Sequence, residues 1–244
     1  IDKMVGKTEV ALYGLAYSIG MLVQLFISGM NSALTPWMYS KIKKGDIRSM
    51  RKVLQLLSIV VVGIAVALML ISPELVLIFG SPKYREAVYV IPPVAASVFF
   101  IFIYNILSMP QFYYEKTQFL MAASMAAAGA NVVLNFIFIR LFGYIAAGYT
   151  TLACYMLYSV GHYIVSKRIL VNEGIQENLM NPGFLLACSV FLIGASIICN
   201  LIFPYRILRY AILLASAGLV FWKKELLLKT MADIRKKIKK WGRI

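Results

Sequence analysis

Charged residues divide the chain into long uncharged runs separated by short basic segments. A helix that crosses a bilayer needs about 20 predominantly apolar residues, and six runs reach that length when His162 is counted as neutral. These runs are apolar all round, whereas a membrane barrel strand would alternate polar and apolar residues. The sequence therefore predicts membrane-spanning helices. The six runs are Val10–Ser40, Val53–Pro73, Ala87–Tyr114, Thr117–Ile139, Leu141–Ser166 and Asn178–Tyr205.

A seventh and shorter run covers Tyr210–Trp222. It reaches spanning length when Ile207 and Leu208 are included, which places Arg206 and Arg209 at the membrane edge. An arginine at that depth can extend its charged end to the headgroups. The expected fold is therefore all-α, a polytopic transmembrane helical bundle of about seven spans.

Composition agrees with a membrane protein and limits the partners. Apolar residues make up 61% of the 244 residues, against about 45–50% in a soluble domain. The net charge of +15 comes from cations that lie between and after the apolar runs. Cations in that position set membrane orientation and bind anionic headgroups. We expect membrane lipids as partners, and no nucleic acid.

The distribution of lysine and arginine predicts the orientation. When the segments between spans are assigned to alternate sides, 18 of the 25 cations fall on one side. Because basic loops stay in the cytoplasm, the N-terminus is expected outside and the C-terminus in the cytoplasm. A chain that starts outside without a signal segment is expected to follow preceding helices that carry it across the membrane. We therefore expect a missing N-terminal portion.

Residues 223–244 differ from the rest of the chain. Apolar side chains recur there at helical spacing among lysines and arginines, which predicts a basic amphipathic helix on the cytoplasmic membrane surface. The alternative is a solvated basic tail, because isolated short helices are marginal in water. The apolar positions are Leu227, Met231, Ile234, Ile238 and Trp241.

The sequence contains no arrangement typical of an enzyme. The uncharged spans hold no aspartate or glutamate, so no pair of carboxylates is available for acid–base work. No glycine-rich phosphate loop is present, and we expect no catalytic residue, no metal and no cofactor. His162 has no neighbour in sequence that suggests a metal site. It is either a packed or interfacial histidine, or a proton-linked one.

Intramembrane amides are the remaining candidates for function. Gln24 and Asn31 are seven residues apart and share a helix face, and Asn105 and Gln111 are six apart. Amides within a span either bond to neighbouring helices or line a wet cavity. They could bind sugar hydroxyls, because an amide both donates and accepts hydrogen bonds. The other intramembrane amides are Gln118, Asn131, Asn135 and Asn200, and tyrosines that could add stacking surfaces are Tyr13, Tyr17, Tyr104, Tyr113 and Tyr114.

Two apolar helices joined by a short break at Arg140–Tyr144 form a predicted hairpin. Its first arm carries Asn131 and Asn135, one turn apart, and its second arm opens with the small residues of 146–148. We expect the two asparagines to hydrogen-bond between helices rather than to bind a sugar.

Three segments resemble the lipid-linked oligosaccharide flippases of the multidrug/oligosaccharidyl-lipid/polysaccharide superfamily. Asn131–Tyr155 resembles a signature with two spaced asparagines, a glycine, small residues, a threonine and a tyrosine. Ile71–Val94 is similar to a Pro-Glu, Gly, Tyr and Ala stretch of that family. Ile1–Gly20 resembles the entry to the second half of those proteins. The three segments occur in the family's order and cover roughly residues 1 to 160.

This resemblance implies two six-helix lobes that face a central cavity, often followed by two extra helices. The chain would be the second lobe of this MATE-like fold, with five spans in 1–169, two additional spans in 170–222 and the tail in 223–244. Its partners would be the missing N-terminal lobe and an undecaprenyl-diphosphate-linked oligosaccharide. That substrate would be moved across a bacterial cytoplasmic membrane by alternating access. The uncharged spans offer no cation for the diphosphate, so Lys41 and Lys116 are candidates at the rim.

The resemblance leaves other substrates open. A peptidoglycan-precursor flippase and a multidrug antiporter belong to the same superfamily, although an antiporter would more often use acidic residues within the membrane. A membrane glycan polymerase or acyltransferase would need a long loop or catalytic His, Asp or Arg groups, and ranks last. The candidates for the substrate path are Gln24, Asn31, Asn105, Gln111, Lys41 and Lys116.

Overall fold

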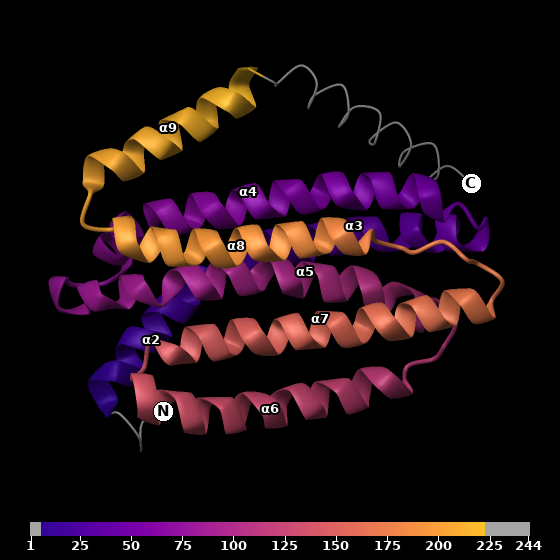
Figure 1. Ribbon diagram of the computed structural model, residues 1–244, viewed down its shortest axis with the longest axis horizontal. Helices are drawn as coiled ribbons and strands as arrows, with labels where there is room; N and C mark the ends of the chain where they lie inside the picture. Colours follow the sequence, from indigo (N-terminus) through magenta and orange to yellow (C-terminus); the bar gives the residue numbers. More distant parts are fainter. Residues whose placement is uncertain (1–5, 223–244) are drawn as a thin grey trace. The chain divides into compact units, whose positions relative to one another are not determined.

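The computed structural model describes residues 6–222 and places eight α-helices and one 3₁₀-helix in them. No strand occurs in this part of the chain, which confirms the all-α prediction. The tail predicted at 223–244 lies outside the described residues. In order, the elements are α2 (Lys7–Gly20), α3 (Leu22–Lys43), α4 (Ile47–Phe79), η1 (Pro82–Tyr89), α5 (Ile91–Tyr113), α6 (Gln118–Phe142), α7 (Ala146–Asn172), α8 (Pro182–Ile202) and α9 (Arg206–Trp222) (Figure 1).

All seven predicted runs are helical, and five helical segments are long and apolar enough to cross a membrane. One of the five consists of α2 and α3 together, and the other four are α4, α5, α6 and α8. α7 has 27 residues but carries more threonine, tyrosine and serine than its neighbours, and α9 has only 17 residues. The chain divides into two compact units between Asn200 and Leu201. The first unit contains every helix up to α7 and nearly all of α8.

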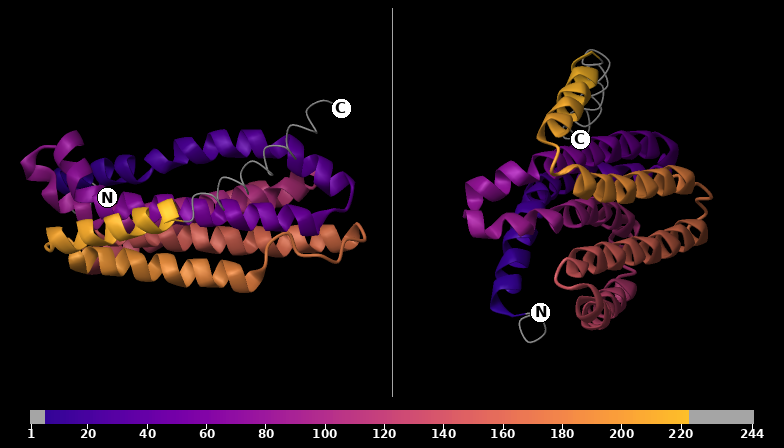
Figure 2. Two further views of the ribbon diagram at one scale, coloured as in Figure 1. Left: turned by 90° about the horizontal axis from the view of Figure 1, so that it is seen from above. Right: turned by 60° about the vertical axis from the view of Figure 1, so that its left-hand side comes forward.

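The first predicted run is two helices rather than one. α2 ends at Gly20 and α3 begins at Leu22, and Met21 between them has φ −82° and ψ −1°. The Met21 amide donates to the Tyr17 carbonyl at 2.9 Å, and the Gln24 amide donates to the Met21 carbonyl at 2.9 Å. The backbone thus tightens into a short turn. Figures 1 and 2 show α2 at a steep angle to α4, α5 and α7.

α5 is the central helix of the first unit. α2, α3, α4 and α7 all pack against it, and nearly all of its residues between Ile91 and Gln111 are buried. A helix that is apolar all round is stable only in such a position or in lipid. Close approach of α7 depends on Gly148, because a Cβ atom there would lie 2.9 Å from Pro93 Cγ and 3.2 Å from the Val90 carbonyl oxygen.

The predicted hairpin is confirmed as α6 and α7. Gly143, with φ +74°, ends α6 in a conformation that favours glycine, and α7 begins three residues later. α6 packs chiefly against α7 and lies at the lower edge of the unit in Figure 1. Only Ile139 of α6 is fully buried. α6 is therefore the most exposed long helix of the first unit.

The two asparagines of α6 join the arms of the hairpin, as predicted. Asn135 Nδ2 donates to Asn131 Oδ1 at 2.8 Å, and Thr150 Oγ1 on α7 donates to Asn135 Oδ1 at 2.5 Å. Asn131 Nδ2 lies 3.6 Å from Cys154 Sγ of α7. These contacts satisfy the amides without water and hold the two helices in register.

Candidate functional site

A cleft of about 580 Å³ opens between α2, α5, α6 and α7, and five of its lining residues are tyrosines. We call it the tyrosine cleft. All five tyrosines are half-buried, so each presents part of its ring to the cleft while the rest packs against a helix. Its lining residues are Tyr13, Tyr17, Tyr104, Ser124, Ala127, Ala128, Asn131, Val132, Thr151, Cys154, Tyr155 and Tyr158.

Helical spacing places these side chains on one face of each helix. Tyr13 and Tyr17 are four residues apart on α2. On α7, Thr151, Tyr155 and Tyr158 follow one another at spacings of four and three. Residues three or four apart lie above one another on a helix. The opposite wall is formed by α6, whose lining residues include the small side chains of Ser124, Ala127 and Ala128.

The rings on α5 and α7 form one continuous aromatic surface. The rings of Tyr104 and Tyr155 are nearly parallel, with centroids 6.3 Å apart and planes 5° from parallel. Tyr104 also meets Tyr158 edge to face at 4.7 Å. On α2, the rings of Tyr13 and Tyr17 lie 5.8 Å apart. Aromatic pairs of this geometry hold one another in fixed orientations, so the surface is preformed.

Hydroxyl groups and one amide supply the polarity of the cleft. Tyr13 Oη and Thr151 Oγ1 are 3.3 Å apart, and Ser124 Oγ lies 2.8 Å from Tyr158 Oη. None of the twelve described residues that line the cleft carries a charge. The cleft can therefore stack flat faces and exchange hydrogen bonds with hydroxyls, but it offers no counter-ion to a charged molecule.

A buried polar pair lies behind the wall of the cleft. His162 and Gln111 are both fully buried, and Gln111 Nε2 lies 2.8 Å from His162 Nδ1, which links α5 to α7. The imidazole ring packs between aromatic rings from three helices: it meets Tyr158 at 4.4 Å, Phe119 at 5.4 Å and Tyr104 at 5.9 Å. Two of these rings line the cleft, so the pair supports the aromatic surface from behind.

The four amides predicted for the substrate path lie outside the tyrosine cleft. Gln24 and Asn31 are half-buried on α3, and Gln24 Oε1 is buried with no hydrogen-bond partner among the described residues. Asn105 donates back to the Ile101 carbonyl of its own helix at 2.8 Å. Gln111 bonds to His162. The amides of α5 thus bond within their own helix and to α7, and all four amides stay candidates for the substrate path.

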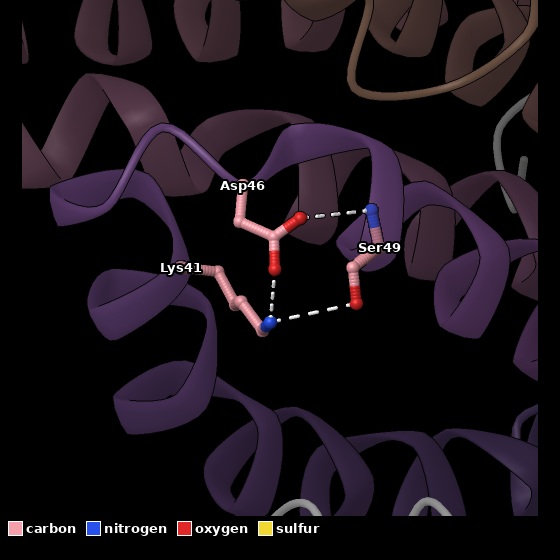
Figure 3. A network of polar contacts seen from close by, with 3 residues as sticks. All are labelled: Lys41, Asp46 and Ser49. Atoms are coloured by element: carbon pink, nitrogen blue, oxygen red, sulfur yellow. Dashed lines mark hydrogen bonds and ion pairs between the residues drawn. The ribbon is translucent and has the colours of Figure 1, made fainter.

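The two predicted rim lysines are both paired with acids. Lys41 is buried and forms an ion pair with Asp46, and its ammonium lies 3.4 Å from Ser49 Oγ (Figure 3). Asp46 also caps α4, because its Oδ1 accepts from the Ser49 amide at 3.2 Å. Lys116 is exposed and lies 3.4 Å from Glu173 Oε1. The Lys41 pair therefore fixes the turn between α3 and α4.

Only some residues of the tyrosine cleft were predicted from the sequence. Tyr13, Tyr17 and Tyr104 were expected as possible stacking surfaces, but Tyr155 and Tyr158 were not singled out. Their spacing of three on α7 was a signal that they share a face. Periodicity could not show that this face turns toward α2 and α5.

Comparison with known proteins identifies the family. The MatE family model matches residues 2–137, which is more than half of the chain. A search of curated proteins found no match, and a search of solved structures also found none. Long apolar helices, a preformed uncharged cleft within the helical unit and the family match agree with one another. The chain therefore belongs to the MatE family, and is a multi-pass membrane protein of the MATE superfamily of exporters.

Proposed function

We propose that the chain is the second lobe of a flippase that moves a lipid-linked oligosaccharide across the cytoplasmic membrane by alternating access. The observation that carries this proposal is the chemistry of the tyrosine cleft. Sugar rings present flat apolar faces edged by hydroxyls, which suits stacked aromatic rings flanked by the hydroxyls of Thr151 and Ser124. The resemblance of residues 1–160 to oligosaccharide flippases points the same way.

The same cleft argues against a multidrug cation antiporter as the alternative. A cationic drug in a low-dielectric site needs a nearby negative charge, because an unpaired buried charge costs several kcal/mol. The described lining residues of the cleft include no carboxylate. A peptidoglycan precursor also carries sugars on a lipid diphosphate, so it stays the second candidate of the same chemical class.

The diphosphate of such a substrate requires cations from elsewhere. Lys41 and Lys116 are each paired with an acid in this structure. We therefore assign the diphosphate to the N-terminal lobe that we propose as the partner of this chain. On the orientation proposed from the lysine and arginine counts, the end of α3 that holds Lys41 faces the cytoplasm, where the substrate is loaded.

The test is to remove the gene from its native cell and to follow both classes of substrate. We expect lipid-linked oligosaccharide to accumulate on the cytoplasmic leaflet, with loss of the surface polysaccharide and unchanged sensitivity to cationic drugs. Re-expression of the complete protein restores export. Accumulation of drug without any change in the glycan would refute the proposal and favour the antiporter.

Gln24 offers a second test within the same assay. Its half-buried amide has an unsatisfied oxygen on α3, on the same helix face as Asn31. If these amides line the substrate path, Gln24→Leu lowers glycan export while membrane abundance stays at the wild-type level. Gln55→Leu, at a half-buried amide of α4, is the matched control. Unchanged export in Gln24→Leu would remove α3 from the path.

A further inference from the structure

Helix α8 is held to the first unit at its ends. On the side of its N-terminus, Arg51 Nε donates to the Asn178 carbonyl at 2.7 Å, and Arg51 forms an ion pair with Glu177 at 3.3 Å. Near its C-terminus, Asn200 Nδ2 donates to the Tyr89 carbonyl at 3.2 Å and to Tyr149 Oη at 3.0 Å. Between these two ends, Leu192 and Ser196 are buried, whereas Leu186 and Val190 are exposed.

The space that this arrangement leaves is an apolar slot of about 280 Å³ between α5, α7 and α8. It is distinct from the tyrosine cleft, because the two share no lining residue. The residues that line the slot are Phe99, Phe100 and Ile103 of α5, Met156, Ser159, Val160 and Tyr163 of α7, and Pro182, Leu185, Leu186 and Ser189 of α8.

The two serines of the slot do not make it polar. Ser159 Oγ lies 2.9 Å from both the Phe100 and the Tyr155 carbonyl oxygens, which share its single proton, and Ser189 Oγ donates to the Leu185 carbonyl at 2.8 Å. The hydroxyl protons of both serines are thus taken up by backbone carbonyls of α5, α7 and α8. Water needs two or more polar partners to stay in a cavity, and an empty gap forfeits dispersion contacts. The slot therefore suits a hydrocarbon chain.

The slot opens to the surroundings of the unit, where a membrane protein meets lipid. Val160 and Leu186 line it and are 56% and 66% exposed. Tyr163 and Pro182 lie toward the connection between α7 and α8. A chain that enters from the bilayer can thus lie along α8 with its headgroup at that connection.

Basic residues lie at the end of the slot that is near the connection between α7 and α8. Lys167 is exposed and follows Tyr163 by one helical turn on α7. Arg51 is half-buried and donates to the Asn178 carbonyl in the connection between α7 and α8, and the adjacent Lys52 is exposed. Glu177 neutralises part of the charge of Arg51. The remaining positive charge matches a phosphate at headgroup level.

We propose that this slot binds one acyl chain of an anionic phospholipid, whose phosphate is held by Lys167 and Arg51. The bound chain fills the space that α8 leaves against α5 and α7 and so completes the packing of that helix. The occupant is a membrane phospholipid and not the transported molecule, because the slot shares no lining residue with the tyrosine cleft.

The test uses the complete protein, purified in detergent and then titrated with lipids while bound lipid is counted by native mass spectrometry. The probes are phosphatidylglycerol, phosphatidylcholine with the same acyl chains, and a polyprenyl phosphate. We expect one phosphatidylglycerol to be retained in preference to phosphatidylcholine. Lys167→Gln is expected to weaken the affinity for phosphatidylglycerol about fivefold, because one lysine near the membrane surface contributes about that much to the binding of an anionic headgroup. Lys43→Gln, at an exposed lysine at the end of α3, leaves it unchanged.

A second pair of variants tests the slot itself. Ser189→Phe places a ring in the slot and is expected to abolish retention of the single phospholipid. Ala187→Phe adds the same ring to an exposed position of α8 outside the slot and retains the lipid. The proposal is overturned by equal retention of both phospholipids, by lipid that survives in Ser189→Phe, or by polyprenyl phosphate displacing phosphatidylglycerol at equal concentration. If Ser189→Phe does not fold, Lys167→Gln still decides the headgroup contact.

Discussion

Replacing Tyr104 and Tyr155 together with leucine is expected to lower glycan export about tenfold or more, with normal amounts of protein in the membrane. The two rings lie nearly parallel with their centroids 6.3 Å apart, and both line the tyrosine cleft. An aromatic contact contributes about 0.5–1.5 kcal/mol beyond the area that it buries. The loss of two such surfaces for a sugar therefore weakens its passage by roughly one to two orders of magnitude.

The matching phenylalanine variant separates stacking from hydrogen bonding. Tyr104→Phe with Tyr155→Phe keeps both rings and removes both hydroxyls, so export should fall much less than in the leucine pair. The control is Tyr39→Leu with Tyr113→Leu, a second pair of tyrosines in ring contact, at 5.5 Å, outside the cleft. Equal losses in the two leucine pairs would mean that packing, and not the cleft, explains the effect.

Gly148→Leu is expected to destabilise the first unit strongly, because α7 approaches the central helix α5 too closely at this position to admit a side chain. A Cβ atom at position 148 would meet the rigid ring of Pro93 at 2.9 Å and the backbone oxygen of Val90 at 3.2 Å. Neither neighbour can turn aside, so the larger side chain must push α7 away from α5. Overpacking of a core costs typically about 1–3 kcal/mol and occasionally more.

The measurement for Gly148→Leu is the midpoint of thermal unfolding in detergent, together with membrane abundance. Gly129→Leu is the matched control, because it makes the same change in a long helix, α6, where a Cβ would meet nothing within 4 Å. We expect a clear drop in the midpoint for Gly148→Leu and little change for Gly129→Leu. Similar midpoints for both variants would show that α5 and α7 do not need this close approach.

The sequence alone determined the class of the protein and most of its helices. A bilayer demands long apolar runs between charges, so length and charge placement were sufficient to find all seven helical regions. The hairpin of α6 and α7 and the role of Asn131 and Asn135 were also predictable. Their partners on α7 follow within about 25 residues, and a short break between two apolar helices forces them together.

Details that depend on distant contacts could not be predicted. The length of the uncharged run did not predict the turn at Met21. That turn depends on local backbone geometry and on the direction in which α2 leaves the bundle. Gln111 pairs with a histidine 51 residues away, which amphipathic spacing cannot identify. Lys41, by contrast, pairs with Asp46 only five residues on, and this pairing could have been inferred from an acid at the start of α4.

The tyrosine cleft shows most clearly what only the tertiary structure decided. Periodicity along each helix places Tyr13 with Tyr17, and Tyr155 with Tyr158, on common faces. It does not say which faces meet, because a helix that is apolar all round has no hydrophobic direction that fixes its rotation. In this protein, that rotation is set by close packing on α5 at positions such as Gly148. Packing against the central helix α5 thus brings tyrosines that are distant in the sequence together in one cleft.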